Sequence, residues 1–306
     1  MPVSEFEIIQ RYFSSYGRGS AVELSVGDDC AILSLAGNER LATSIDSQVE
    51  GVHFLKDSFP EDIGYRAVSA AASDLAAMGA RPIGMMLAMT LPEVDELWLH
   101  AFAEGVASAS TGYRLPLVGG DTTRGPRCIT VQVMGALPAD KTLLRGGAQA
   151  GDLLCVSGVL GDAAAGLAIL KGEWQAQPEH AEYLLHRFNR PEARLDLGRS
   201  LLESATAAID ISDGLLADAG HLAAASGVRV CIESERLPLS EALRSHPDPD
   251  QVRQWALTGG DDYELCFSLP PSLPIPSGCS RIGSIVEGHG LLCDAKAVTE
   301  SGYAHF

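Results

Sequence analysis

Residues 61–91 read EDIGYRAVSAAASDLAAMGARPIGMMLAMTL, and this stretch decides the fold class. Its alanine-rich first part predicts a helix over Glu61–Met78, which Gly79 and Pro82 terminate. The apolar run Ile83–Leu91 then predicts a strand. A helix followed directly by an apolar strand is typical of proteins that mix helices with a β-sheet.

Further helices and strands are expected on both sides of this stretch. An N-terminal helix is expected around Phe6, Ile9 and Phe13, where Ser4 and Glu7 form a capping box. Further strands are predicted at Ala31–Leu35, Leu41–Ile45, Leu115–Val118, Cys128–Leu137, Asp152–Ser157, Ala207–Ile211, Val228–Ile232, Tyr263–Leu269 and Arg281–Val286. Helices are predicted at Asp95–Ser110, from Asp162, at Glu182–Phe188, at Ala193–Ser204, and from Ser212 or Asp213. The pattern favours two α/β (α+β) domains, residues 1–138 and 139–306, with a glycine-rich hinge after Pro138.

Charge and composition restrict the possible partners. The chain has 306 residues, with 22 Lys plus Arg against 40 Asp plus Glu, so its formal net charge is −18. A surface this acidic repels nucleic acids and anionic membranes, and we expect neither as a partner. A phosphate substrate would need its charge neutralised, and a divalent metal ion is the usual means.

Several common motifs are missing from the sequence. The P-loop pattern requires a Gly-Lys pair, and none occurs. Protein-kinase signatures are absent as well. The seven cysteines show no C-x-x-C spacing and are expected to be buried thiols in a reducing compartment. With no apolar leader or membrane-length apolar run, a cytoplasmic location is expected.

Carboxylates recur where an apolar strand or a glycine-rich turn ends. These acids are Asp29, Asp46, Asp121, Asp210, Asp213, Asp261 and Asp262. Each alone also fits a turn or a helix cap. Asp74 is different, because it interrupts the apolar face of a predicted helix, where a carboxylate is costly unless it is paired or metal-bound.

Together, these acids suggest a site for Mg²⁺ and a polyphosphate. Mg²⁺ binds carboxylate oxygens, waters and substrate phosphates. The neighbouring glycines allow backbone N–H groups to approach phosphate oxygens, and the helix start near Ser212 offers more N–H donors. His53 and Arg145 are further polar candidates, although a lone histidine is more often structural, and Arg145 can equally be solvated.

With these motifs, the sequence resembles a known family, the bacterial thiamine-monophosphate kinases, from a superfamily that includes aminoimidazole ribonucleotide synthetase. The likeness runs nearly end to end. It is carried by Val26–Leu33, Thr43–Asp46, Gly51–Phe54, Ser73–Ala80, Gly119–Thr122, Leu144–Ala148, Ile209–Leu215 and Thr258–Leu265. The resemblance implies two PurM-like domains: an N-terminal ATP- and metal-binding domain that dimerises by joining sheets, and a C-terminal α/β domain.

The resemblance also implies a role for each candidate residue. Several Mg²⁺ ions would be bound by Asp29, Ser44, Ile45, Asp46, Asp74, Asp121, Asp210 and Asp213. ATP would contact Gly120, Asp121, Arg145 and Ser212. Thiamine phosphate would contact His53, Asp261 and Tyr303. The family often has Glu in place of Asp261.

The implied reaction is ATP-dependent phosphorylation of thiamine phosphate to thiamine diphosphate by direct in-line transfer in a homodimer. Selenophosphate synthetase would need a reactive cysteine near the N-terminus, and residues 1–25 contain none. A hydrogenase-maturation relative would need a C-terminal cysteine, whereas this chain ends in Phe306. An aminoimidazole ribonucleotide synthetase-like enzyme and a non-catalytic metal–nucleotide binding module remain as alternatives.

Overall fold

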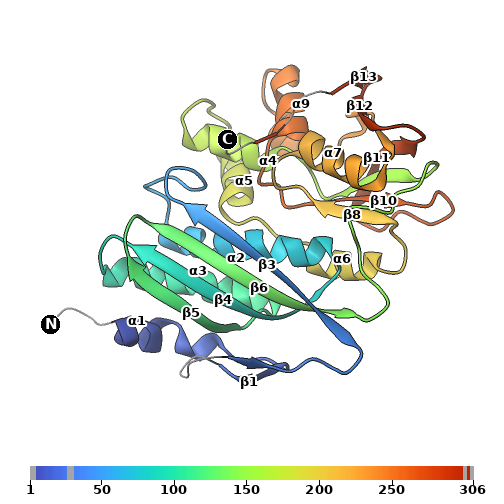
Figure 1. Ribbon diagram of the computed structural model, residues 1–306. Helices are drawn as coiled ribbons and strands as arrows, with labels where there is room; N and C mark the ends of the chain where they lie inside the picture. The colour runs from blue at the N-terminus through green and yellow to red at the C-terminus, as the bar shows by residue number, and fades with distance from the viewer. Residues whose placement is uncertain (1–4, 26–30, 299–301, 304–306) are drawn as a thin grey trace. The chain divides into compact units, whose positions relative to one another are not determined.

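The computed structural model describes residues 5–25, 31–298 and 302–303 (Figure 1). The chain forms two compact units. The first unit holds the residues up to Leu75 and Ala80–Lys141, and the second holds Ala76–Gly79 and the residues from Thr142 onward.

The first unit is built on a four-stranded sheet with strand order β3-β6-β4-β5. Its helices and strands are α1 (Glu5–Tyr12), η1 (Ser14–Tyr16), β1 (Val22–Leu24), β2 (Ile32–Leu33), β3 (Glu39–Val49), α2 (Pro60–Ala77), β4 (Arg81–Leu91), α3 (Glu96–Tyr113), β5 (Leu117–Arg124) and β6 (Cys128–Pro138). Helices α2 and α3 cover one face of this sheet (Figure 1). Alternate side chains of β4 and β6, such as Leu87 and Val131, are buried on that face.

Local sequence signals explain how the helices of this unit begin and end. Asp95 caps α3 by accepting hydrogen bonds from the backbone N–H groups of Leu97 and Trp98. Gly79 follows α2 with φ +70°, the left-handed backbone that favours glycine after a helix. The predicted helix over Glu61–Met78 is therefore confirmed to within one residue at each end.

The second unit contains a seven-stranded sheet with strand order β13-β12-β9-β11-β7-β10-β8. Its elements are β7 (Leu153–Ser157), α4 (Asp162–Leu170), α5 (Pro178–Asn189), α6 (Leu195–Leu201), β8 (Ala207–Asp210), α7 (Leu215–Ser226), β9 (Arg229–Ile232), η2 (Ser234–Arg236), α8 (Glu241–Arg244), α9 (Pro249–Thr258), β10 (Leu265–Leu269), β11 (Cys279–Val286), β12 (Gly290–Cys293) and β13 (Lys296–Ala297). Leu215, Ala219 and Leu222 of α7 share a core with the sheet residues Ile209 and Val230.

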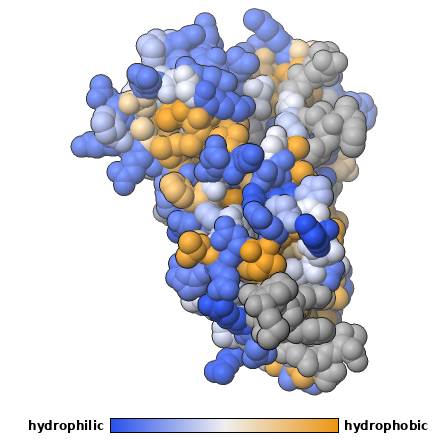
Figure 2. Space-filling view, turned by 90° about the vertical axis from the view of Figure 1, so that its left-hand side faces the viewer, coloured by the Kyte–Doolittle hydropathy of each residue, from blue (hydrophilic) through white to orange (hydrophobic). Residues whose placement is uncertain are grey.

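The sequence did not predict every element. It missed the short turns of helix η1 and η2 and the elements β1, α8, α9, β12 and β13, which are short or carry polar and proline-rich sequence. The space-filling view in Figure 2 shows one side of the protein as mostly hydrophilic, with hydrophobic residues in separate groups. Within the described ranges, no helix has the length and apolar character needed to cross a membrane.

Candidate functional site

The first group of candidate residues lies between β3 and α2 in the first unit. Ser44 and Asp46 pair with Val133 and Val131 of β6, so their side chains lie on the helix-covered face of the sheet. Ser44 Oγ donates a hydrogen bond of 2.5 Å to Asp74 Oδ2 on α2. The Asp74 carboxylate, which interrupts the apolar face of α2, is thus directed at the segment of β3 that contains Asp46.

Charge repulsion is built into this group. Burial raises the pKa of Asp46, and the negative charge of Asp74 raises it further. His53 and Arg66 act in the opposite direction by favouring the ionised carboxylate. Two carboxylates that disfavour each other's ionisation form a place where a bound cation is stabilising.

The donor atoms of this group suit Mg²⁺. They are carboxylate and hydroxyl oxygens, and Mg²⁺ commonly binds one or two protein carboxylates while keeping waters and substrate phosphates. Across the part of the chain that the structure describes, no three His, Cys, Asp or Glu side chains surround one metal position. Asp29, also expected to bind metal, lies outside the described residues.

His53 lies in the turn after β3, close enough to affect Asp46. Its Nδ1 accepts a hydrogen bond from the Val49 backbone N–H at 3.1 Å, which fixes the ring against the end of the strand. Ile45, between Ser44 and Asp46, has its side chain 65% exposed on the opposite face of the sheet. Only its backbone can therefore take part in the group on the covered face.

Two expectations about strand ends are wrong. Asp46 and Asp121 each lie inside a strand, because β3 continues to Val49 and β5 to Arg124. Asp121 pairs with Ala88 on the exposed face of the sheet, three strand spacings from β3, or about 14 Å. Within one chain, Asp121 therefore does not join Asp46 and Asp74 around one metal ion.

Gly120 has a clear structural reason to be glycine. A Cβ at this position would lie 1.9 Å from the carbonyl oxygen of Leu87 on the adjacent strand. No side chain fits there without moving β5 away from β4. This close approach accounts for the glycine independently of any phosphate contact.

The second group surrounds the start of α7 in the second unit. Asp210 ends β8, and Ser212 and Asp213 follow it. Asp218 Oδ2 accepts hydrogen bonds from the backbone N–H groups of Ser212, Asp213 and Gly214 at 3.0, 3.1 and 3.2 Å. The expectation that these amides are available to an anion is therefore wrong, because a carboxylate of the protein already occupies them.

Asp218 was not predicted as a site residue. Its pKa is raised to about 7, mainly by burial and in addition by the negative charges of Asp210 and Asp213. These three carboxylates form a second site of mutual repulsion. The sequence signal that could have identified Asp218 is an acid in the first turn of a helix that follows the loop Ser212–Gly214.

Asp261 and Tyr303 both approach this second group. The Asp261 backbone N–H donates to the Ser212 carbonyl oxygen at 2.9 Å, and the Tyr303 N–H donates to the Asp213 carbonyl oxygen at 3.1 Å. Gly302 has φ +120°, and a Cβ there would lie 2.5 Å from that of Ala217. Tyr303 is thus anchored beside the start of α7, with its side chain 51% exposed.

The backbone of Arg145 lies at the C-terminal end of α7 and not at its start. Its carbonyl oxygen accepts a hydrogen bond from Ser226 Oγ at 3.0 Å, and Ser226 is the last residue of α7. Ser212 precedes the opposite end of that helix. Arg145 is exposed, so its contribution to an ATP site depends on the reach of its side chain.

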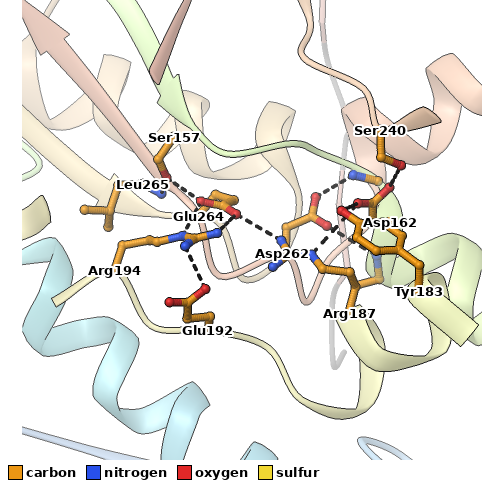
Figure 3. A network of polar contacts seen from close by, with 12 residues as sticks. Ser157, Asp162, Tyr183, Arg187, Glu192, Arg194, Ser240, Asp262, Glu264 and Leu265 are labelled. Carbon is orange, nitrogen blue, oxygen red and sulfur yellow. Dashed lines mark hydrogen bonds and ion pairs between the residues drawn. The ribbon is translucent and has the colours of Figure 1, made fainter. Parts of the chain in front are cut away.

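A network of acids and arginines surrounds the buried side chains of Asp262 and Glu264, which follow Asp261 in the chain (Figure 3). Glu264 accepts hydrogen bonds from Arg187, Arg194 and Ser157, and Asp162 accepts from Tyr183 and Ser240. Asp262 accepts a hydrogen bond from the Gly161 N–H at 2.7 Å, at the start of α4. None of these roles was predicted, although Glu264 before the apolar run Leu265–Leu269 has the same signature as Asp74.

The buried Asp262 predicts a pH-dependent stability. Burial raises its pKa to about 8, so the folded protein holds a proton that the unfolded chain releases near pH 4. Stability contributed by this proton is present at low pH and is lost as pH rises toward 8, by up to about 1.4 kcal/mol per pH unit. We expect Asp262→Asn to flatten this decline in denaturant unfolding between pH 5 and 9. An unchanged pH profile would contradict this assignment.

The chain is similar to proteins of known family over its full length. Residues 27–137 match the family model described as AIR synthase related protein, N-terminal domain. The thiamine-monophosphate kinase of Salmonella typhimurium is 43% identical over 322 aligned positions, covering 100% of this chain and 99% of that protein. The crystal structure of thiamine-monophosphate kinase from Stenotrophomonas maltophilia has a TM-score of 0.88 at 40% identity, covering 97% of this chain and 99% of that one.

A third relative has been solved with ligands. The structure described as AaThiL complexed with AMPPCP and TMP has a TM-score of 0.83 at 35% identity, and the match covers 99% of this chain and 97% of that one. Residues 27–137 are thus an AIR synthase related N-terminal domain. The chain as a whole belongs to the thiamine-monophosphate kinase family.

Proposed function

We propose that this protein transfers the γ-phosphoryl group of ATP to thiamine phosphate, giving ADP and thiamine diphosphate. The observation that carries the proposal is the match to thiamine-monophosphate kinases over the full length of the chain. The paired acids of both units, Asp46 with Asp74 and Asp210 with Asp213 and Asp218, support it, because they are suited to a reaction between polyanions.

The proposed chemistry needs no strong base. A phosphate acceptor has a second pKa near ~6 and is largely deprotonated at neutral pH. What the reaction requires is positioning of two polyanions and neutralisation of their charge. Bound Mg²⁺ would supply that neutralisation and would stabilise charge on the transferred group. Direct in-line transfer requires no covalent intermediate on the protein.

Each candidate residue has a proposed role in this reaction. Ser44, Asp46, Asp74 and the Ile45 carbonyl would bind Mg²⁺ in the first unit, where Asp121 would contact metal-bound ATP separately. In the second unit, Asp210 and Asp213 would bind metal, and Ser212 and Arg145 would contact ATP. His53, Asp261 and Tyr303 would bind thiamine phosphate. Asp29 would bind Mg²⁺ and Gly120 would contact ATP, as predicted from the sequence. We also propose a cytoplasmic location.

A coupled assay of ADP release tests the proposed reaction. ATP turnover should depend on both thiamine phosphate and Mg²⁺. Turnover with formylglycinamidine ribonucleotide instead would favour an aminoimidazole ribonucleotide synthetase-like enzyme. ATP binding without turnover on either acceptor would favour a metal–nucleotide binding module and would overturn the proposal.

Asp261→Asn should specifically weaken the binding of thiamine phosphate. The thiazolium ring carries a fixed positive charge, and a partly desolvated carboxylate contact is worth about 1–2 kcal/mol. We expect the KM for thiamine phosphate to rise about 5- to 30-fold in steady-state assays, with little change for ATP. Tyr303→Ala should act in the same direction and Tyr303→Phe only mildly, because the ring face matters more than the hydroxyl. Equal increases in both KM values would disprove this role for Asp261.

We also propose a homodimer formed by the first unit. Its sheet has one face that the helices leave open, where Leu41 is 54% exposed and Ile45 and Met86 are also exposed. An apolar sheet face of this kind needs cover. Light scattering should give about 64 kDa, twice the 32.2 kDa chain mass, and Leu41→Asp should shift this toward one chain. A monomer at micromolar concentration would exclude the dimer.

A further inference from the structure

The loop that carries Asp261 has a backbone conformation that most side chains avoid. Its φ angle is +70° at Asp261 and +50° at Tyr263. Asp tolerates this left-handed region, whereas a bulky residue such as Tyr is disfavoured there. Such conformations persist only where surrounding contacts hold them, and they concentrate at functional sites.

Two backbone hydrogen bonds hold one side of this loop. The N–H groups of Asp261 and Tyr263 donate to the carbonyl oxygens of Ser212 and Ile211, both at 2.9 Å. The loop is therefore attached to the same segment that leads into α7. The position of the Asp261 backbone is set relative to Ser212.

Two buried acidic side chains, Asp262 and Glu264, hold the other side. Asp262 is 2% exposed and accepts the Gly161 N–H at 2.7 Å, where α4 begins. Glu264 is fully buried, and its Oε1 accepts hydrogen bonds from Arg194 Nη2 at 2.6 Å and Arg187 Nη2 at 2.9 Å (Figure 3). Asp262 and Glu264 directly precede and follow Tyr263 in the chain. The buried contacts of these two acids therefore hold the backbone on both sides of Tyr263.

A further contact connects the two strained residues, Asp261 and Tyr263, directly. Tyr263 Oη donates a hydrogen bond of 3.2 Å to Asp261 Oδ1. The Tyr263 side chain is largely buried, so its hydroxyl position is set by packing. A buried phenol that donates to a carboxylate restricts the rotation of that carboxylate.

We propose that Tyr263 is a positioning residue that orients the Asp261 carboxylate toward the cationic ring of thiamine phosphate, on a loop whose strained backbone Asp262 and Glu264 hold. This inference rests on the proposed function, in which Asp261 contacts that ring. Orienting the carboxylate before binding lowers the entropic cost of forming the contact. Loss of the Tyr263 hydroxyl should therefore weaken the binding of ligands that carry the thiazolium ring and leave the binding of ATP unchanged.

Tyr263→Phe tests this role because it removes only the hydroxyl. We expect the KM for thiamine phosphate to rise about threefold to tenfold, with the KM for ATP and the melting temperature nearly unchanged. The inhibition constant of thiamine, which carries the ring without the phosphate, should rise by the same factor. Unchanged values for both ring-bearing ligands would overturn the proposal.

Tyr183→Phe is the matched control. Tyr183 also donates a hydrogen bond to an aspartate of the second unit, Asp162, at 2.9 Å. Its removal should leave both KM values unchanged. If Tyr183→Phe raised the KM for thiamine phosphate as much as Tyr263→Phe, the effect would be a general loss of packing, and the positioning role would be refuted.

A double-mutant cycle separates this inference from the function on which it rests. Asp261→Gly removes the carboxylate and accommodates the positive φ angle. In that background, Tyr263→Phe should have no further effect on the KM for thiamine phosphate. If Asp261→Gly alone leaves that KM unchanged, the proposed contact of Asp261 fails. If Asp261→Gly raises it and Tyr263→Phe does not, only the positioning role fails.

Discussion

Asp74→Asn should lower kcat/KM for thiamine phosphate by at least about 100-fold and leave the protein folded. Asp74 accepts a hydrogen bond from Ser44 and faces Asp46, and its charge raises the pKa of Asp46. The amide keeps the shape of the side chain but removes one anionic donor for Mg²⁺. Without metal, the melting temperature should be equal or higher, because the repulsion is removed.

Glu61→Gln provides a control on the same helix. Glu61 lies in the first turn of α2, about 20 Å along the helix from Asp74. Its neutralisation should cost only the small helix-dipole contribution of about 0.3–1 kcal/mol. Activity should be measured across a range of Mg²⁺ concentrations for both variants. Near-normal turnover by Asp74→Asn at limiting Mg²⁺ would remove Asp74 from the metal site.

Glu264→Gln should lower the free energy of unfolding by about 3–5 kcal/mol. Glu264 accepts hydrogen bonds from Arg187 and Arg194, and all of its carboxylate is buried. Its neutral replacement leaves two largely buried guanidinium groups without their shared anion. Urea unfolding at neutral pH measures this loss directly.

The chain contains a matched control for this experiment as well. Glu192 also forms an ion pair with Arg194, at 2.9 Å, but its side chain is 61% exposed. Because water screens exposed pairs, Glu192→Gln should cost no more than about 1 kcal/mol. Similar losses for the two variants would mean that burial does not determine the strength of this network.

The sequence was sufficient for the elements with strong local signals. The alanine-rich helix and its glycine stop predicted α2, and a carboxylate on its apolar face singled out Asp74. Burial of a charge in such a helix can be inferred from its immediate neighbours in the sequence. The structure adds a partner of Asp74, Ser44, which lies 30 residues earlier in the chain.

The relative placement of the acids could not be predicted in the same way. Asp46 and Asp121 both follow apolar or glycine-rich sequence, yet strand pairing separates them by three strand spacings and assigns them to opposite faces. A sheet face depends on register, and register depends on pairing partners far away in sequence. Glu264 was missed for a related reason, because Arg187 and Arg194 precede it by 77 and 70 residues.

The left-handed backbone at positions 261 and 263 also limits how this loop can vary. At both positions, β-branched residues would be the most strongly disfavoured, while Gly, Asn and Asp fit with little strain. In a saturation library, position 261 should therefore tolerate short polar residues for folding, whatever they do to binding. Backbone shape and charge favour the same residue, Asp, at 261. At position 263, by contrast, the backbone conformation disfavours Tyr. The contacts of its ring and hydroxyl therefore account for the tyrosine there.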